Sequence, residues 1–435
     1  MARFHEDREV LLPHSKSGWR AYLVALPVVA AVVAVVLLGV AGSWSAPEDT
    51  ARPSAFEHLA MASSSPFASP TQPTPTPQPT PYVLPEFLTI EVNPADRIAY
   101  DVPSDTYPID ADGETFLFST NDTSLFVLTP SRSPIRVATP RPCGQIEQAA
   151  ISGMQVIYSE IVPYGYYGDA RYGCPANFED TVDWYVSIVG TTGGSRVIDS
   201  GNYSIAADAG VADAGPADAA PRVAITDLTY AFSRPNPTGE SAAVEVHRLA
   251  DDKRLFNSAS LLTPVQVRLG GDQLVAVSPG PAWADRPDGA LSVLTTTDWA
   301  TPMQVVSHTS GLFALSRDGK RLAFAGCNGD AQCGTLEAID PGVHWGLGLD
   351  SPATSLSIDS GAASMFQATA WISATDGASS VHLIVGSSDN RIALSGLETP
   401  LWVHIQADVL LCLTITSNGR VQLMRLDLNQ VLPVV

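Results

Sequence analysis

The chain has 435 residues, which is long enough for one large domain or two ordinary ones. Hydrophobic residues make up 45% of it and charged residues only 16%, so a sizeable core can form and disorder of the whole chain is excluded. The formal net charge is -21, and the sequence has no basic stripe. A surface of this sign repels phosphate backbones, which argues against nucleic acid as a partner.

An apolar segment near the amino terminus, residues 21–43, predicts one membrane-spanning helix. From Ala21 to Gly42 it contains no charged residue. At a rise of about 1.5 Å per residue, a helix of this length crosses a hydrocarbon core of about 30 Å. Trp19 and Trp44 lie at its two ends, where aromatic rings prefer the headgroup layer.

Charges on either side of this segment predict its orientation in a plasma membrane. The basic residues before it are Arg3, Arg8, Lys16 and Arg20, whereas the fifteen residues after it hold only Arg52. Positive charge stays inside, so residues 1–20 are expected to form a cytoplasmic tail and the rest of the chain to lie outside the cytoplasm. A cleaved signal peptide is the alternative, because residues 41–43 are small; the length of the apolar run favours an uncleaved, single-pass anchor.

Residues 44–85 predict an extracytoplasmic linker. Their second half is rich in Pro, Thr and Ser, and proline occupies every second position from Pro73 to Pro81. Each proline fixes φ and removes a hydrogen-bond donor, so polyproline II is the expected conformation. Such a segment is a semi-rigid spacer between a membrane and an outer domain.

Residues 86–435 have the pattern of an all-β domain. Short runs of Val, Ile, Leu, Phe, Tyr and Thr alternate there with Gly, Asp, Asn, Ser and Pro. Residues 314–326, ALSRDGKRLAFAG, place a tight Asp318-Gly319 turn between two strands. Residues 109–118, IDADGETFLF, repeat this pattern, and weaker copies give turns near positions 113, 153, 227, 272, 319, 364 and 408.

The spacing of these turns predicts a repeated unit. Successive turns are 40, 74, 45, 47, 45 and 44 residues apart, and the long step contains two insertions, residues 162–181 and 206–221. A period of 40–45 residues in an all-β chain indicates the four-stranded blades of a β-propeller. Seven blades fit the spacing, and six or eight stay open. Residues 87–92 are expected to close the ring by pairing with residues 421–426, which would remove exposed sheet edges.

Residues 314–326 resemble the repeat of TolB-like and WD-type β-propellers. Blades of that kind carry the pattern Leu-Ser-Pro-Asp-Gly-Lys-x-Leu-Ala-Phe; here Arg317 replaces the proline, and only residues 109–118 also come near the full pattern. The resemblance implies a propeller over about residues 85–435. It does not imply an activity, since propellers serve in ligand binding, scaffolding and catalysis.

Two pairs of cysteines are candidate disulfides. Cys327 and Cys333 bracket a short loop, and Cys143 and Cys174 lie in neighbouring loops; an extracytoplasmic setting permits both bridges. Cys412 lies in an apolar strand and is expected to be buried and unpaired.

The sequence assigns no residue a catalytic, cofactor-binding or metal-binding role. Zinc would need Cys-x-x-Cys or His at ligand spacing, and neither occurs. Asp110-Ala-Asp-Gly-Glu114 invites a calcium interpretation, but the remaining ligands are missing and its match to the blade turn favours a structural role. No Gly-x-Ser-x-Gly elbow and no phosphate-binding glycine loop is present, so the sequence predicts no enzyme.

A tyrosine-rich insertion is the candidate contact loop. It contains Tyr164, Tyr166, Tyr167 and Tyr172 among glycines, a composition that gives a large contact area at low entropic cost. Packing of this loop on the propeller itself is the equal alternative. The sequence thus predicts a membrane-anchored propeller that binds a protein or an envelope component; an envelope hydrolase or lyase, and a signalling protein acting through its inner tail, are the alternatives.

Overall fold

The computed structural model describes residues 87–130, 132–163, 181–204, 220–235, 242–258, 266–279, 289–295, 298–327, 333–340, 343–349, 351–358, 368–375, 378–385 and 390–432. The chain divides into two compact units, Met1–Thr80 and Pro81–Val435, and the fold below is that of the second. The predicted tail, membrane segment and linker (residues 1–85) lie outside the described residues. Within the described ranges, no helix is long and apolar enough to cross a membrane.

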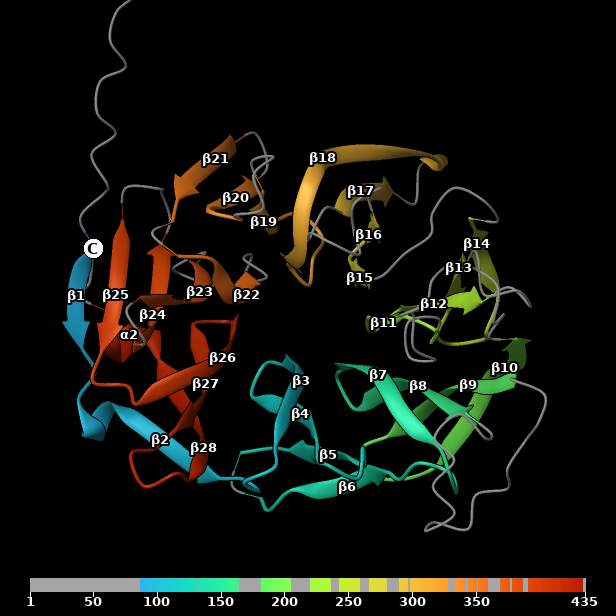
Figure 1. Ribbon diagram of the computed structural model, residues 1–435, viewed down its shortest axis with the longest axis horizontal. Helices are drawn as coiled ribbons and strands as arrows, with labels where there is room; N and C mark the ends of the chain where they lie inside the picture. Colours follow the sequence, from blue (N-terminus) through green and yellow to red (C-terminus); the bar gives the residue numbers. More distant parts are fainter. Residues whose placement is uncertain are drawn as a thin grey trace, which may run out of the picture. The chain divides into compact units, whose positions relative to one another are not determined.

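The described strands form antiparallel groups of four, called blades here and numbered along the chain (Figure 1). Blade 1 contains β3 (Tyr107–Asp112), β4 (Thr115–Ser119), β5 (Leu125–Leu128) and β6 (Ile135–Ala138). Blade 2 contains β7 (Gln145–Ser152), β8 (Gln155–Pro163), β9 (Thr181–Gly190) and β10 (Ser195–Ser204). Blade 3 contains β11 (Val223–Ile225), β12 (Thr229–Pro235), β13 (Ala242–Arg248) and β14 (Arg254–Asn257).

Blades 4 and 5 share one long strand, so they form a single seven-stranded sheet. The first part of β18 (Asp298–Leu315), as far as Thr309, pairs with β17 of blade 4, and its last part, from Thr309 onward, pairs with β19 of blade 5. The other strands of blade 4 are β15 (Gln266–Gly270), β16 (Gln273–Pro279) and β17 (Gly289–Thr295). Those of blade 5 are β19 (Leu322–Gly326), β20 (Thr335–Asp340) and β21 (Val343–Gly348).

Blades 6 and 7 each take a strand from the amino-terminal side of the domain. Blade 6 contains β22 (Ala353–Ile358), β23 (Ala368–Thr375), β24 (Ala378–Val385) and β25 (Arg391–Ser395), with β1 (Leu88–Glu91) added in parallel as a fifth strand. Blade 7 contains β26 (Thr399–Gln406), β27 (Val409–Ile415) and β28 (Val421–Asp427), and β2 (Arg97–Asp101) is its outer strand. Two short helical turns complete the described elements, η1 (Pro94–Asp96) and α2 (Leu428–Val431).

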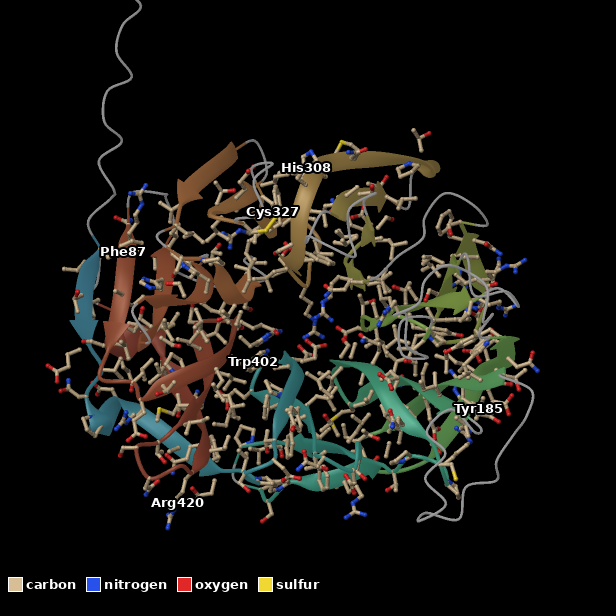
Figure 2. All side chains as sticks on the ribbon, in the orientation of Figure 1. Phe87, Tyr185, His308, Cys327, Trp402 and Arg420 are labelled. Carbon is tan, nitrogen blue, oxygen red and sulfur yellow. A yellow bond between two sulfur atoms is a disulfide. The ribbon has the colours of Figure 1, made fainter. Side chains whose placement is uncertain are left out.

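The innermost strands of the blades line a ring. Each of β3, β7, β11, β15, β18, β22 and β26 contacts the next one, and β26 contacts β3. Apolar side chains fill the spaces between neighbouring sheets (Figure 2). One cluster joins Val275 and Val277 of blade 4 to Phe313 and Phe324 of blade 5, and similar clusters lie between the other neighbours. The β-propeller prediction is therefore confirmed.

Six of the predicted repeat turns, those near 113, 153, 227, 272, 319 and 408, lie in the described ranges, and each falls between the first and second strands of a blade. These connections define the turn end of the ring, which in the described residues comprises residues 113–114, 153–154, 226–228, 271–272, 316–321 and 407–408. The turn expected near 364 lies outside the described residues, between β22 and β23. Because the strands are antiparallel, the connections between second and third strands, and between blades, leave from the opposite end, called the loop end.

The predicted closing strand is wrong. Residues 88–91 form β1, which pairs in parallel with β25 of blade 6. Residues 97–101 form β2, and it is this strand that pairs with β28, with Tyr100 opposite Leu423. Tyr100 packs into the apolar cluster between blades 7 and 1, so β2 covers the edge of blade 7 and contributes to its core. The η1 turn, which begins with Pro94, separates the two strands.

Replacement of β2 tests this closure. Exchanging residues 97–101 for Gly and Ser of equal length, in the full chain, should lower the free energy of unfolding by on the order of 3 kcal/mol, because it exposes the edge of β28 and removes Tyr100. The same exchange of residues 88–91, which lie outside the four-stranded unit, should cost about 1 kcal/mol. Denaturant unfolding measures both; an equal loss would contradict closure by β2.

Candidate functional site

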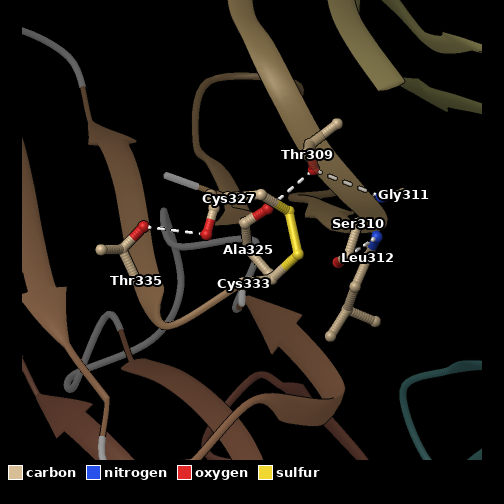
Figure 3. The surroundings of a disulfide bond; sticks show 9 residues. Thr309, Ser310, Gly311, Leu312, Ala325, Cys327, Cys333 and Thr335 are labelled. Carbon is tan, nitrogen blue, oxygen red and sulfur yellow. Dashed lines mark hydrogen bonds between the residues drawn. A yellow bond between two sulfur atoms is a disulfide. The ribbon is translucent and has the colours of Figure 1, made fainter. Parts of the chain in front are cut away.

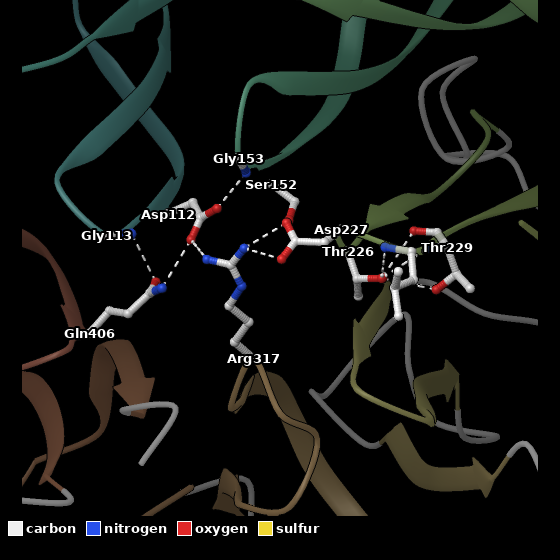
Figure 4. A network of polar contacts seen from close by, with 10 residues as sticks. Asp112, Gly113, Ser152, Gly153, Thr226, Asp227, Thr229, Arg317 and Gln406 are labelled. Atoms are coloured by element: carbon white, nitrogen blue, oxygen red, sulfur yellow. Dashed lines mark hydrogen bonds and ion pairs between the residues drawn. The ribbon is translucent and has the colours of Figure 1, made fainter. Parts of the chain in front are cut away.

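Arg317 lies on the turn between β18 and β19 and reaches across the turn end of the ring (Figure 4). One of its terminal nitrogens donates to Asp112 Oδ1, on blade 1. The other donates to both carboxylate oxygens of Asp227, on blade 3, at 2.6 and 2.5 Å. A single guanidinium therefore joins three blades that are not neighbours in the ring.

Further hydrogen bonds join the neighbouring turns around Arg317. Gln406 Nε2 of blade 7 donates to Asp112 Oδ1 at 2.9 Å, and its Oε1 accepts from the backbone N–H of Gly113 at 2.9 Å. Asp112 Oδ2 accepts from the backbone N–H of Gly153 on blade 2. Ser152 Oγ of blade 2 donates to Asp227 Oδ1 at 2.9 Å. Blades 7, 1, 2 and 3 are thus linked in sequence, and Arg317 connects blade 5 to them.

Hydrogen bonds and opposite charges in this cluster outweigh the cost of burying Arg317 and Asp227 in ionised form. Asp112 is only 8% exposed in its side chain, against 37% for Arg317 and 57% for Asp227. The hydrogen bonds from Arg317 hold the pKa of Asp227 below its ordinary value, although desolvation opposes them. Desolvation also acts to lower the pKa of Arg317, but the bonds and charges of Asp227 and Asp112 outweigh it and raise this pKa.

The turn that carries Arg317 packs tightly against the turn of blade 4. The Arg317 carbonyl accepts from the N–H of Gly271 at 2.8 Å. A Cβ at Gly271 would lie 2.2 Å from the carbonyl oxygen of Asp318, and one at Gly319 would lie 2.1 Å from that of Gly270. Both glycines also have positive φ, so any other residue would be strained there. Glycine at these two positions fixes the place from which Arg317 extends.

The predicted Cys327–Cys333 disulfide is present (Figure 3). It joins the end of β19 to the start of β20 at the loop end of blade 5, and both cysteines are buried. Thr309 Oγ1 donates to the Ala325 carbonyl at 2.7 Å beside it, where β18 passes from blade 4 to blade 5. The disulfide therefore closes a short loop next to the shared strand.

The structure tests the prediction for Cys412, but it does not test those for the second disulfide and for the tyrosines of the contact loop. Cys412 is buried and free, and burial raises its pKa to about 12. Cys143 is described but Cys174 lies outside the described residues, so their pairing stays a prediction. The tyrosines of the contact loop also lie outside the described residues: Tyr164, Tyr166, Tyr167 and Tyr172.

The acidic turn considered for calcium is used for contacts between blades. Asp110 Oδ2 accepts from the N–H of Ile151 at 3.1 Å, Asp112 binds Arg317, and Glu114 accepts from Arg425 at 2.6 Å. Among the residues that the structure describes, no group of three or more His, Cys, Asp or Glu is placed to hold a metal ion. The Arg317 cluster was not predicted from the sequence; its one signal was the arginine in place of the repeat proline.

Comparison with known proteins does not assign this chain to a family. No protein-family model and no curated protein matches the sequence. Similar solved structures include a chain of a mitotic checkpoint complex (10% identity, TM-score 0.45, covering 82% of this chain and 98% of that one). A prolyl endopeptidase structure gives 14% identity and a TM-score of 0.49, covering 77% of this chain and 47% of that one. The β-propeller domain of the trilobed protease from Pyrococcus furiosus gives 12% identity and a TM-score of 0.45, covering 74% of this chain and 95% of that one.

Removal of the Arg317 side chain tests whether it stabilises the ring. Arg317→Met should lower the free energy of unfolding by about 2 kcal/mol, between the values for exposed and buried ion pairs, because Asp112 would stay buried without its cation. Arg420→Met, at an exposed arginine on the connection between β27 and β28, should change it by less than about 0.5 kcal/mol. Equal effects in denaturant unfolding would contradict a special role for Arg317.

Thiol counting tests both disulfides together. If both bridges are formed, the unreduced native protein should react with no maleimide, because the remaining cysteine, Cys412, is buried and has a raised pKa. Unfolding without reductant should expose one thiol if Cys143 pairs with Cys174 and three if it does not. Mass spectrometry reads the number of adducts; labelling of Cys327 or Cys333 before reduction would contradict the structure.

Proposed function

We propose that this chain is a single-pass membrane protein of the cell envelope whose outer β-propeller binds a protein or another envelope component through its loop end. The fold supports a binding or scaffolding role in general. The observation that carries the proposal is the difference between the two ends of the ring.

The turn end is held together by short connections and by the Arg317 cluster. The longest segments between consecutive strands of the domain join strand ends that lie at the loop end: residues 164–180 connect β8 to β9, and residues 205–222 connect β10 to β11. Binding residues usually lie on loops that vary in length and sequence and that a rigid scaffold holds in place. The tyrosine-rich composition of residues 164–180 supports a contact role.

Asp227, at the turn end, does not have the raised pKa that a hydrolase or lyase needs in a general acid. A general acid needs a raised pKa, so that the carboxyl holds its proton near neutral pH. Hydrogen bonds from Arg317 instead lower the pKa of Asp227, and Asp112 is bound to the same guanidinium. These groups therefore act as ion-pair partners.

The envelope location rests on the apolar segment at residues 21–43 and on the cysteines. A disulfide such as Cys327–Cys333 persists in an oxidising compartment and is rare in the cytoplasm, which supports an outer domain. The acidic composition supports a partner other than nucleic acid. The signalling alternative requires the tail at residues 1–20 to contact a second, cytoplasmic partner.

Site-specific photo-crosslinking in intact cells tests the proposal. A photoreactive phenylalanine analogue at Tyr166, in the loop-end insertion, should give a discrete crosslinked adduct. The same analogue at Leu228, which is 75% exposed at the turn end, should give none. Adducts from Leu228 alone would contradict binding through the loop end.

Protease added outside intact cells should digest the propeller and leave a fragment that retains residues 1–43. Protection of the propeller would contradict the proposed orientation, and a mature amino terminus at or after residue 43 would contradict the anchor.

A further inference from the structure

The central channel contains a cavity of about 140 Å³ that the Arg317 cluster borders. It is lined by the inner strands, with Arg268 on β15, Asp110 on β3 and His404 on β26. Trp402, also on β26, contributes to the wall, where it stacks on His404 with the ring centroids 5.9 Å apart. Pockets for drug-sized ligands usually measure about 300–1,000 Å³, so an occupant of this cavity must be small.

Most polar groups around the cavity are already paired within the protein. Arg317 is bound to Asp112 and to Asp227, and Gln406 is bound to Asp112 and Gly113. His404 Nε2 lies 3.3 Å from Gln406 Oε1, an oxygen that can only accept, so this nitrogen carries the proton. Desolvation lowers the pKa of His404, which leaves the ring neutral.

Two oppositely charged side chains on the cavity, Arg268 and Asp110, are not paired with another charged group of the described residues. Arg268 is half-buried, and it makes no hydrogen bond or ion pair with another described residue. Asp110 uses Oδ2 for the N–H of Ile151, while Oδ1 has no partner within the described ranges. The two side chains come from blades 4 and 1, and no ion pair joins them. A half-buried guanidinium and a half-buried carboxylate on one cavity are electrostatically complementary to a ligand that carries both charges.

We propose that this cavity binds a small free α-amino acid, with its carboxylate on Arg268 and its ammonium group on Asp110. The guanidinium fork suits a carboxylate, with which it can form two parallel hydrogen bonds. Asp110 Oδ1 is the acceptor for the ammonium group. Phe313 and Leu356 add apolar wall, which suits a small apolar side chain. The inference is independent of the proposed envelope role, because it rests on the channel alone.

Calorimetric titration of the full-length chain in detergent with three ligands of similar size tests the proposal. Alanine carries both charges, propionate only the carboxylate and isopropylamine only the ammonium group. Alanine should bind most tightly, propionate more weakly and isopropylamine weakest. Absence of alanine binding up to about 50 mM, or equal binding of alanine and isopropylamine, would overturn the proposal.

Matched variants test whether Arg268 binds the carboxylate of the ligand and Asp110 its ammonium group. Arg268→Gln should weaken alanine binding by about 10-fold to 100-fold, whereas Arg420→Gln, at the exposed control arginine, should not change it. Asp110→Asn keeps an acceptor for Ile151 and should reduce alanine affinity to that of propionate, with propionate binding unchanged. Unaltered alanine binding in Arg268→Gln would overturn the assignment; if that variant does not fold, Arg268→Lys, which keeps the charge but loses the fork, should still weaken binding.

Discussion

The fold depends on the burial of apolar faces between neighbouring sheets. Each blade has side chains on a face that it cannot cover itself, and the described clusters join blade to blade around the ring. Such an arrangement is complete only when the last sheet also meets the first. The contact of β26 with β3, together with the pairing of β2 with β28, provides that closure.

Closure of the ring places the seven inner strands around one axis, where polar groups from distant parts of the chain meet. At the turn end this produces the Arg317 cluster, in which one cation serves two carboxylates from blades 1 and 3. Deeper in the channel, Arg268 and Asp110 are not joined in this way. The same geometry thus yields a stabilising ion-pair cluster and, next to it, a candidate ligand site. The loop end, which carries the long connections, remains the proposed surface for a larger partner.

The repeat was visible in the sequence because its turns have local chemistry. Asp112-Gly113 and Asp318-Gly319 are tight turns that neighbouring residues alone specify, and both occur where they were predicted. Ring closure was mispredicted because residues 97–101 begin and end with a charge and hold three apolar residues out of five, whereas residues 87–92 hold four out of six. Tertiary packing of Tyr100 decides that pairing, and no local pattern reports it.

The sequence indicated the candidate site only through one position at which the repeat pattern is broken. Arg317 was recognised as a replacement for the repeat proline, but its partners lie 205 and 90 residues away in the sequence. Contacts over such separations follow from how the blades are arranged around the axis. The burial of Cys412 and the Cys327–Cys333 bridge, in contrast, follow from an apolar run and a short spacing.

Arg317 couples blade 5 to blade 1 across the channel, and a double-mutant cycle between Arg317 and Asp112 tests this coupling most directly. Stabilities of Arg317→Met, Asp112→Asn and the double variant give the interaction energy of the pair. We expect at least about 1 kcal/mol of coupling, since the two charges are in contact and the side chain of Asp112 is buried. Additive effects of the two substitutions would contradict it.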